Sequence, residues 1–294
     1  MTLVLGAGGV VGRAFHAGVL RALAERCGWD ARHADLIVGT SAGAQVGALL
    51  RLGWTPRALF ARASAPPAAK RGGGPRRAWP ASMAYLRSVY AAPRRARIGP
   101  LVAALLPEAE GGDDRLGEGF DGLGDGWPDE PLWIPAMDLD RGVRVVFGRA
   151  DAPPVSVVAA VCSSSAVPGV NRPVHIGARR YVDGGISSAT HADLAACPSD
   201  ATRALPRVAL VLSPLSKFAP MRWLLRRELA ALARVGVETI LFEPDRALGA
   251  AMGWNPLDPA RARAVAELAY RRTLDRLQAM TVADTKTMRR GGSR

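Results

Sequence analysis

One short pattern constrains the fold of this chain more than any other feature: G-x-S-x-G, from Gly39 to Gly43 with Ser41 at its centre. It lies between an apolar run at 35–38, which predicts a buried strand, and an apolar stretch at 44–52 with helical spacing. In this place the pattern is typical of a sharp strand-to-helix turn, where the glycines leave room for backbone to approach backbone. The hydroxyl of Ser41 would then stand at a helix N-terminus, where amides and the helix dipole favour negative charge. An ordinary N-cap serine is the alternative.

The same order of strand, turn and helix also occurs at the start of the chain. An apolar run at 2–5 is followed by glycines from Gly6 onward and by helical spacing over 12–26. The repeat predicts a mainly parallel α/β sheet with ligands at the carboxyl ends of its strands. Later strands are predicted at 132–137, 143–147, 179–182, 208–212 and 238–242, with a hairpin turn at 140–142, and later helices at 221–235 and 261–280.

The length and composition predict one large domain. The chain has 294 residues, and 49% of them are hydrophobic, which is enough for a single extensive core. We assign residues 1–280 to this domain and residues 281–294 to a basic, disordered tail. Residues 55–130 are predicted to form a lid or insertion, with loops at 64–80 and 111–127 and short helices at 83–90 and 98–106.

The charge is unevenly distributed along the chain. The formal net charge is +13, and almost all of the basic residues are arginine, as expected for a chain from a genome rich in G and C. No acidic residue occurs from Leu36 to Pro107, whereas eleven basic residues lie between Arg51 and Arg97. This segregation suggests a basic face for an anionic partner, and an ordinary solvated face is the alternative.

Three widely spaced cysteines give neither a disulfide framework nor a CxxC metal pair. No apolar stretch is long enough to span a membrane, and no signal-like segment precedes the first strand. We therefore expect a cytoplasmic protein without a metal or another cofactor. A peripheral contact with the inner face of the membrane is compatible with these features.

A nucleophilic serine needs a base, and the sequence offers two kinds. Asp183 follows the predicted strand 179–182 and precedes Gly184 and Gly185, which would let its loop approach the nucleophile closely. Asp-Gly-Gly is also a common turn, because Asp bonds its own backbone and Gly accepts positive φ. Among the four histidines only His191 trails Asp183, so a Ser-His-Asp triad stays open, although Ser41 follows too few strands for an α/β-hydrolase.

The glycine loop from Gly6 to Gly12 turns backbone amides toward the carboxyl edge of the sheet. Such a loop is either a phosphate cradle or an oxyanion hole. As a dinucleotide fingerprint it is imperfect, because Val11 stands where the third glycine of G-x-G-x-x-G belongs. The acidic ribose ligand expected after the second strand is also missing.

Together, the glycine loop, the G-x-S-x-G turn and the distant Asp-Gly-Gly resemble the patatin-like phospholipase family. Segments 134–139, 163–169 and 181–185 support the resemblance, which runs from about residue 3 to residue 245 and leaves the lid region unmatched. The resemblance implies a three-layer α/β/α fold and a Ser-Asp dyad without a catalytic histidine.

Carried over by motif, Ser41 is the nucleophile and Asp183 the base. The amides of Gly8 and Gly9 form the oxyanion hole. Motif support comes from the remaining glycines, Gly6, Gly12, Gly39, Gly43, Gly184 and Gly185. The loop departs from the family pattern where Ala7 replaces a glycine and Val11 replaces a basic residue; Arg13 is the nearest cation.

The resemblance implies hydrolysis of phospholipids or other lipid acyl esters. Next to such a site, the acid-free basic span favours an anionic membrane over nucleic acid as the partner. Two other hypotheses remain. The chain could be a nucleotide-binding α/β protein that uses its glycine loop for pyrophosphate. It could also be a non-catalytic basic protein that binds membrane or nucleic acid through residues 51–97.

Overall fold

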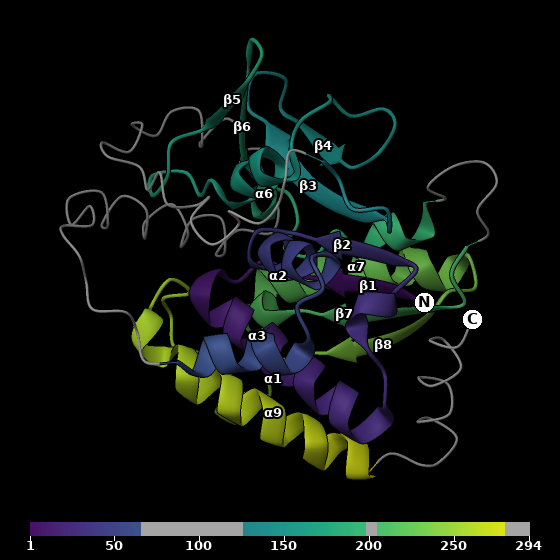
Figure 1. The fold of residues 1–294 in the computed structure, drawn as a ribbon, viewed down its shortest axis with the longest axis vertical. Coiled ribbons are helices and arrows are strands. Elements are labelled where there is room, and N and C mark those ends of the chain that lie inside the picture. Colours follow the sequence, from purple (N-terminus) through teal and green to yellow (C-terminus); the bar gives the residue numbers. More distant parts are fainter. Residues whose placement is uncertain (66–125, 198–204, 280–294) are drawn as a thin grey trace.

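The computed structural model describes residues 1–65, 126–197 and 205–279, which form an α/β fold around one central sheet (Figure 1). The strand order is β5-β6-β3-β2-β1-β7-β8, and β4 also pairs with β3. The strands are β1 (Thr2–Leu5), β2 (Leu36–Gly39), β3 (Leu132–Asp138), β4 (Val143–Phe147), β5 (Val174–Ile176), β6 (Arg179–Asp183), β7 (Val208–Leu212) and β8 (Glu238–Phe242).

The sheet is parallel in its larger part. Strands β3, β2, β1, β7 and β8 run in one direction, whereas β4 and β6 are antiparallel to β3, and β5 is antiparallel to β6. The carboxyl ends of β1, β2, β7 and β8 therefore meet at one edge. The glycine loop after β1 and Ser41 after β2 lie side by side there, as the sequence predicts.

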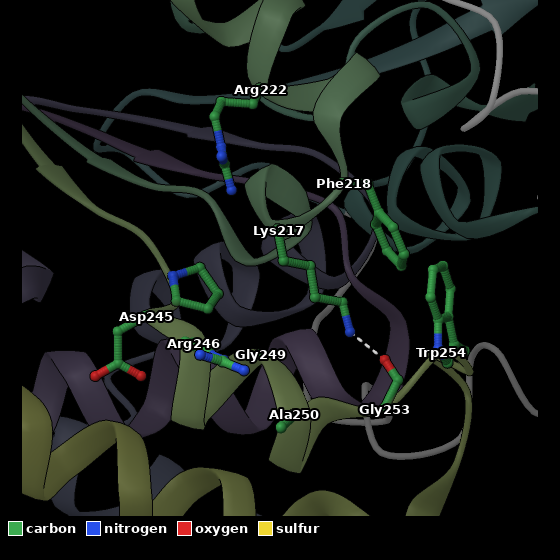
Figure 2. A pocket seen from close by; sticks show the side chains of 10 residues that line it. Lys217, Phe218, Arg222, Asp245, Arg246, Gly249, Ala250, Gly253 and Trp254 are labelled. Atoms are coloured by element: carbon green, nitrogen blue, oxygen red, sulfur yellow. Dashed lines mark hydrogen bonds between the residues drawn. The ribbon is translucent and has the colours of Figure 1, made fainter.

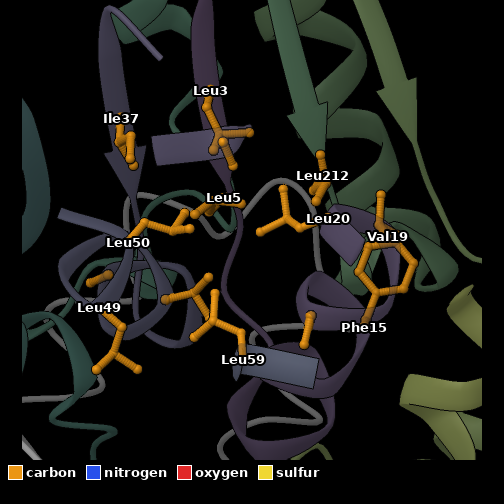
Figure 3. Close-up of a cluster of buried hydrophobic side chains, with 14 of the residues drawn as sticks. Leu3, Leu5, Phe15, Val19, Leu20, Ile37, Leu49, Leu50, Leu59 and Leu212 are labelled. Atoms are coloured by element: carbon orange, nitrogen blue, oxygen red, sulfur yellow. The ribbon is translucent and has the colours of Figure 1, made fainter. Parts of the chain in front are cut away.

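Helices cover both faces of the sheet. One face is covered by α1 (Gly9–Cys27), α2 (Ala42–Arg51), α3 (Pro56–Ser64), α6 (Val157–Ser165) and α9 (Ala262–Ala279). Their apolar side chains meet those of the strands in the main core, where Leu3, Leu5 and Ile37 are fully buried (Figure 3). The other face is covered by α7 (Ala219–Arg234) and the short helix Ala192–Ala196. The three-layer α/β/α fold is confirmed.

The start of the predicted lid differs from the prediction. Residues 56–64 form α3, which packs against α1 and α9 in the helical layer and buries Leu59 and Phe60. The local sequence explains this helix, because Thr55 caps its N-terminus and Pro56 occupies its first turn. The predicted loops lie largely, and the helices at 83–90 and 98–106 entirely, outside the described residues, as does the tail 281–294.

The elements that were not predicted from the sequence include two short ones. Strand β5 is a three-residue edge strand, and α8 (Arg246–Met252) is a two-turn helix capped by Asp245. Both are too short to show a clear period in the sequence. In the described part of the chain, no helix has the length and apolarity required to cross a membrane.

Candidate active site

Ser41 occupies a strained turn between β2 and α2. Its backbone has φ 52° and ψ −113°, a positive φ that few residues other than glycine adopt. The turn brings Gly43 so close to β1 that a Cβ atom there would lie 1.9 Å from the carbonyl oxygen of Leu5. Only glycine fits at this position, so the second glycine of G-x-S-x-G is required by the close approach of the two backbones.

The side chain of Ser41 lies next to the carboxyl group of Asp183 and stabilises its ionised form. Both residues are buried, at 6% and 5% exposure. Strand β6 delivers Asp183 to this point because it pairs with β3, with Asp183 opposite Ala136, and because the amide of Asp183 donates to the carbonyl oxygen of Ala166 at 3.0 Å. The structure therefore brings together two residues that are 142 positions apart in the sequence.

The surroundings of Asp183 favour its protonated form. Burial raises the pKa of its carboxyl to about 6, although the contact with the Ser41 side chain and the hydrogen bond from the amide of Gly185 lower it in part. The Gly185 amide donates to Oδ1 at 2.7 Å and so fixes the orientation of the carboxylate. A carboxyl group with a pKa near neutrality is suited to accept and return a proton in the same reaction cycle.

The glycine loop lies beside both residues. A Cβ atom on Gly185 would lie 3.3 Å from the Cβ of Ala7, and one on Gly12 would lie 3.5 Å from the Cβ of Ala42, the residue after the serine. The loop is held by amides that donate outward, from Gly6 to Leu212 and from Ala7 to Ala189, at 2.9 and 2.7 Å.

The next two amides of the loop, those of Gly8 and Gly9, have no acceptor among the described residues. Gly9 has φ 60°, and a Cβ there would lie 2.5 Å from the carbonyl oxygen of Pro256. These two amides at the start of α1 are therefore available to an anionic group, as at other helix N-termini.

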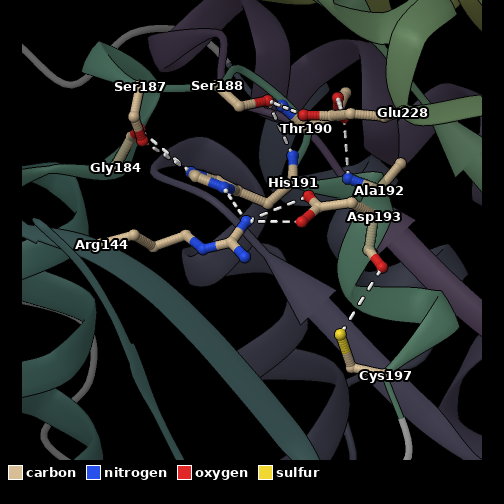
Figure 4. Close-up of polar contacts among 10 residues, drawn as sticks. All are labelled: Arg144, Gly184, Ser187, Ser188, Thr190, His191, Ala192, Asp193, Cys197 and Glu228. Carbon is tan, nitrogen blue, oxygen red and sulfur yellow. Dashed lines mark hydrogen bonds and ion pairs between the residues drawn. The ribbon is translucent and has the colours of Figure 1, made fainter. Parts of the chain in front are cut away.

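His191 lies outside this pair of residues. It is 1% exposed, its Nε2 donates to the carbonyl oxygen of Gly184 at 3.1 Å, and its Nδ1 accepts from Arg144 at 3.1 Å (Figure 4). Burial and the Arg144 guanidinium lower the pKa of His191 to about 4. Neither nitrogen is recorded as bonded to Ser41 or Asp183 within the described ranges, so the triad left open by the sequence is not assembled.

The sequence profile of the patatin-like phospholipase family matches residues 3–196, which include every predicted site residue. The chain belongs to this family. A comparison with curated proteins gave no significant match. The patatin-like family is one of lipid acyl hydrolases.

The departures from the patatin-like glycine loop have structural explanations. Ala7 is buried in a small apolar cluster with Ala189, Leu215 and Met221, which accommodates its methyl group. Val11 points into the main core at 1% exposure, where a basic side chain would have no place. Arg13 instead donates to the side chain of Gln45, one helical turn after the serine, and burial lowers the pKa of its guanidinium.

Ser164 was not predicted as a site residue, although it lies in segment 163–169, which supports the family resemblance. The Ser164 hydroxyl accepts from the amide of Ser41 at 2.9 Å and donates to the carbonyl oxygen of Pro135 at 2.6 Å. Next to it, the hydroxyl of Ser165 accepts from the Gln45 amide at 3.1 Å. These two contacts tie α6 to the turn that carries the nucleophile. The run of three serines at the end of an apolar helix was the signal that could have pointed to them.

Glu228 of α7 is a second buried carboxylate that sequence analysis missed. It accepts hydrogen bonds from Ser188, from Thr190 at 2.5 Å and from the amide of Ala192 at 2.9 Å (Figure 4). Burial raises the pKa of Glu228 to about 7. Because the carbonyl oxygen of Ala189 holds the amide of Ala7, Glu228 supports the loop that positions the glycine loop.

Three basic residues of the acid-free span fall in the described part of the chain. Arg51 donates to the carbonyl oxygens of Arg32, Ala34 and Pro131 and so has a structural role. Arg62 lies over the ring of Trp54, and Arg57 is exposed on α3. Within the described ranges, no cluster of three or more His, Cys, Asp or Glu side chains could hold a metal ion.

Proposed function

We propose that this protein hydrolyses lipid acyl esters through a Ser-Asp dyad, with Ser41 as nucleophile and Asp183 as general base. The observation that carries the proposal is the contact between the Ser41 side chain and the buried Asp183 carboxyl group, at a turn strained in the manner of a nucleophile elbow. Membership of a lipid acyl hydrolase family supports the same reaction class.

In the acylation step, the Ser41 Oγ attacks the acyl carbonyl carbon while Asp183 takes the hydroxyl proton. The charge that develops on the carbonyl oxygen is stabilised by the free amides of Gly8 and Gly9, an effect of about 2.7–4 kcal/mol for one donor in a comparable site. Collapse of the tetrahedral intermediate breaks the ester bond, and the leaving alcohol receives its proton from Asp183. The product is an acyl-enzyme on Ser41.

In the deacylation step, Asp183 accepts a proton from water, which attacks the acyl carbonyl carbon. The same oxyanion hole serves the second intermediate. Ser41 leaves with the proton returned by Asp183, and the fatty acid is released. One carboxyl group thus acts as base and acid in both halves, which its raised pKa favours.

For the substrate we propose phospholipids or related lipid acyl esters, reached by peripheral contact with an anionic membrane. The uneven charge, with eleven basic residues and no acid between residues 36 and 107, supports this contact. Nucleotide binding by the glycine loop has less support, because it gives no role to the contact between Ser41 and Asp183.

The test measures hydrolysis of a soluble p-nitrophenyl acyl ester and of short-chain phosphatidylcholine by the wild-type protein and by Ser41→Ala. We expect hydrolysis of both esters, with a loss of at least about 10⁴-fold in kcat in the variant, because the remaining groups cannot form an acyl-enzyme. Ser163→Ala is the matched control, because its hydroxyl bonds the carbonyl oxygen of Ala159 and not the dyad. Equal activity of Ser41→Ala and wild type would contradict the proposal.

A further inference from the structure

A cavity of about 440 Å³ lies beside the C-terminal half of the sheet (Figure 2). It lies at the carboxyl ends of β7 and β8, the edge that also carries the glycine loop and Ser41. It is lined by Lys217, Phe218, Arg222, Asp245, Arg246 and Trp254, among others. All of these residues follow residue 196, where the match to the patatin-like family ends.

Three cations line this cavity. Lys217 is half-buried and donates to the carbonyl oxygen of Gly253, Arg222 donates to the carbonyl oxygen of Ser216 at 2.9 Å, and Arg246 is exposed. In Figure 2 the three side chains lie around the same space. For none of the three is a carboxylate partner recorded within the described part of the chain. Burial, and to a smaller extent the nearby Arg261, lowers the pKa of Lys217 to about 8.

The one acid in the lining is engaged elsewhere. The Asp245 carboxylate accepts from the amide of Leu248 at 2.8 Å and pairs with Arg272 at 3.2 Å. In Figure 2 it points away from Lys217. The cations of the cavity are therefore left for a ligand with negative charge, since like charges gathered without a counter-ion repel each other.

The wall of the cavity continues to the glycine loop. Gly253, which accepts from Lys217, is followed by Trp254, whose side chain is 78% exposed and contacts the ring of Phe218 at 5.4 Å between centroids. Two residues further, the carbonyl oxygen of Pro256 accepts from the amide of Val11 at 3.0 Å. One short segment thus borders both the cavity and the loop proposed to bind the oxyanion.

The spacing of the strands gives the distance between Ser41 and the cavity. Ser41 follows β2, whereas β7 and β8 lie two and three strands away in the sheet, which corresponds to roughly 10–14 Å. An ester that carries a charged group a few bonds beyond its alcohol oxygen can cover this separation together with the long side chains of Lys217 and Arg246.

We propose that this cavity binds an anionic group, phosphate or carboxylate, on the alcohol side of the acyl ester cleaved at Ser41. The proposal rests on the proposed function, because it names the class of ester that the same site takes. Lys217, Arg222 and Arg246 supply charge-assisted hydrogen bonds to the anion, and Trp254 and Phe218 form an apolar wall beside it. The ligand is the phosphate-bearing part of the substrate, and free inorganic phosphate shares its chemistry.

The kinetic test compares two soluble esters with the same acyl chain, 1-hexanoyl-glycerol 3-phosphate and 1-hexanoylglycerol. The readout is the ratio of kcat/KM for the phosphate ester to kcat/KM for the neutral ester. We expect a ratio of at least about tenfold in wild type and a fall of at least about fivefold in Arg246→Gln and in Lys217→Gln, because each variant removes one charged donor. Arg246 is exposed, so its variant should fold normally.

Arg226→Gln is the matched control, because Arg226 is exposed on the same helix as Arg222 but does not line the cavity. Its ratio should equal that of wild type, which separates a local contact from the effect of total charge. An unchanged ratio in both Arg246→Gln and Lys217→Gln would overturn the proposal.

The binding test measures by calorimetry how inorganic phosphate binds to two proteins. One is the single variant Ser41→Ala, and the other is the double variant that also carries Arg246→Gln. Binding that is lost with Arg246→Gln supports the anion site even if wild type hydrolyses neither ester, in which case the proposed function fails alone. Equal binding by both proteins would overturn the site. Phosphate binding that depends on Arg246, combined with an unchanged ester ratio, would assign the site to free phosphate and overturn its role in substrate binding.

Discussion

Two buried carboxylates, Asp183 and Glu228, show how similar environments can serve different purposes. Burial raises the pKa of each, to about 6 and about 7. The oxygens of Glu228 are occupied by Ser188, Thr190 and the amide of Ala192, which are all parts of one loop. Asp183 instead faces the hydroxyl of a serine with φ 52°. A raised pKa alone therefore does not identify the catalytic base. The neighbouring serine with a strained backbone does.

The same conservative change at both carboxylates tests most strongly whether their roles differ. Asp183→Asn should lower kcat by at least about 10³-fold, because an amide cannot accept the serine proton. Glu228→Gln should lower it by less than about tenfold, because a side-chain amide keeps one acceptor for the loop. Both values come from steady-state hydrolysis of the same acyl ester at pH 8. Comparable losses in the two variants would show that the carboxylates do not differ in role.

Stability should respond in the opposite sense. Glu228→Ala leaves two hydroxyls and one amide without their acceptor, so we expect the free energy of unfolding to fall by about 2–5 kcal/mol. Asp183→Asn should leave it unchanged or raise it at pH 8, because it removes a buried charge. Urea unfolding followed by circular dichroism measures both. A strongly destabilised Asp183→Asn would give Asp183 a mainly structural role.

The pH dependence separates the two groups further. Activity needs the ionised form of Asp183, so kcat/KM should rise about tenfold per pH unit below about 6 and level off above it. A profile measured from pH 4.5 to 9 tests this. A midpoint near the usual carboxyl pKa would contradict the effect of burial on Asp183.

Stability has the opposite slope, since a raised pKa means that the folded state holds the proton more tightly. The stability contributed by the protonated forms is complete below the usual pKa, 3.8 for Asp and 4.5 for Glu, and is lost as the pH rises through about 6 and about 7. The loss is about 1.4 kcal/mol per pH unit for each group between its two pKa values. Unfolding curves of Asp183→Asn and Glu228→Gln, subtracted from those of wild type, should isolate the two contributions.

The smallest effect is expected at His191. Its two nitrogens bond Arg144 and the carbonyl oxygen of Gly184, so His191→Ala should lower kcat by less than about tenfold, whereas loss of a triad histidine costs about 10⁴-fold or more. The same ester assay decides between the two. A loss of kcat as large as that of Asp183→Asn would support a Ser-His-Asp triad and contradict the dyad.

The parts of the fold and site that are encoded locally were predictable. The strand-turn-helix unit around Ser41 is contained in a short stretch of sequence. The turn after β6 is likewise contained in the three residues Asp-Gly-Gly. What supports these turns was not predictable, because Ser164 and Glu228 act through contacts with residues far away in the sequence. The predicted start of the lid at residue 55 differs from the structure for the same reason. Helix α3 is amphipathic and weakly apolar, and its packing in the core depends on α1 and α9.

The central claim is that Ser41 is a nucleophile activated by Asp183, and covalent labelling tests it most directly. A fluorophosphonate probe is added to wild type, Ser41→Ala, Asp183→Asn and Glu228→Gln, and the adduct is located by peptide mass mapping. Our account predicts one adduct on the peptide that contains Ser41, at a similar rate in wild type and Glu228→Gln, much slower in Asp183→Asn and absent in Ser41→Ala. An adduct on another residue, or equal labelling of Ser41→Ala, would contradict it.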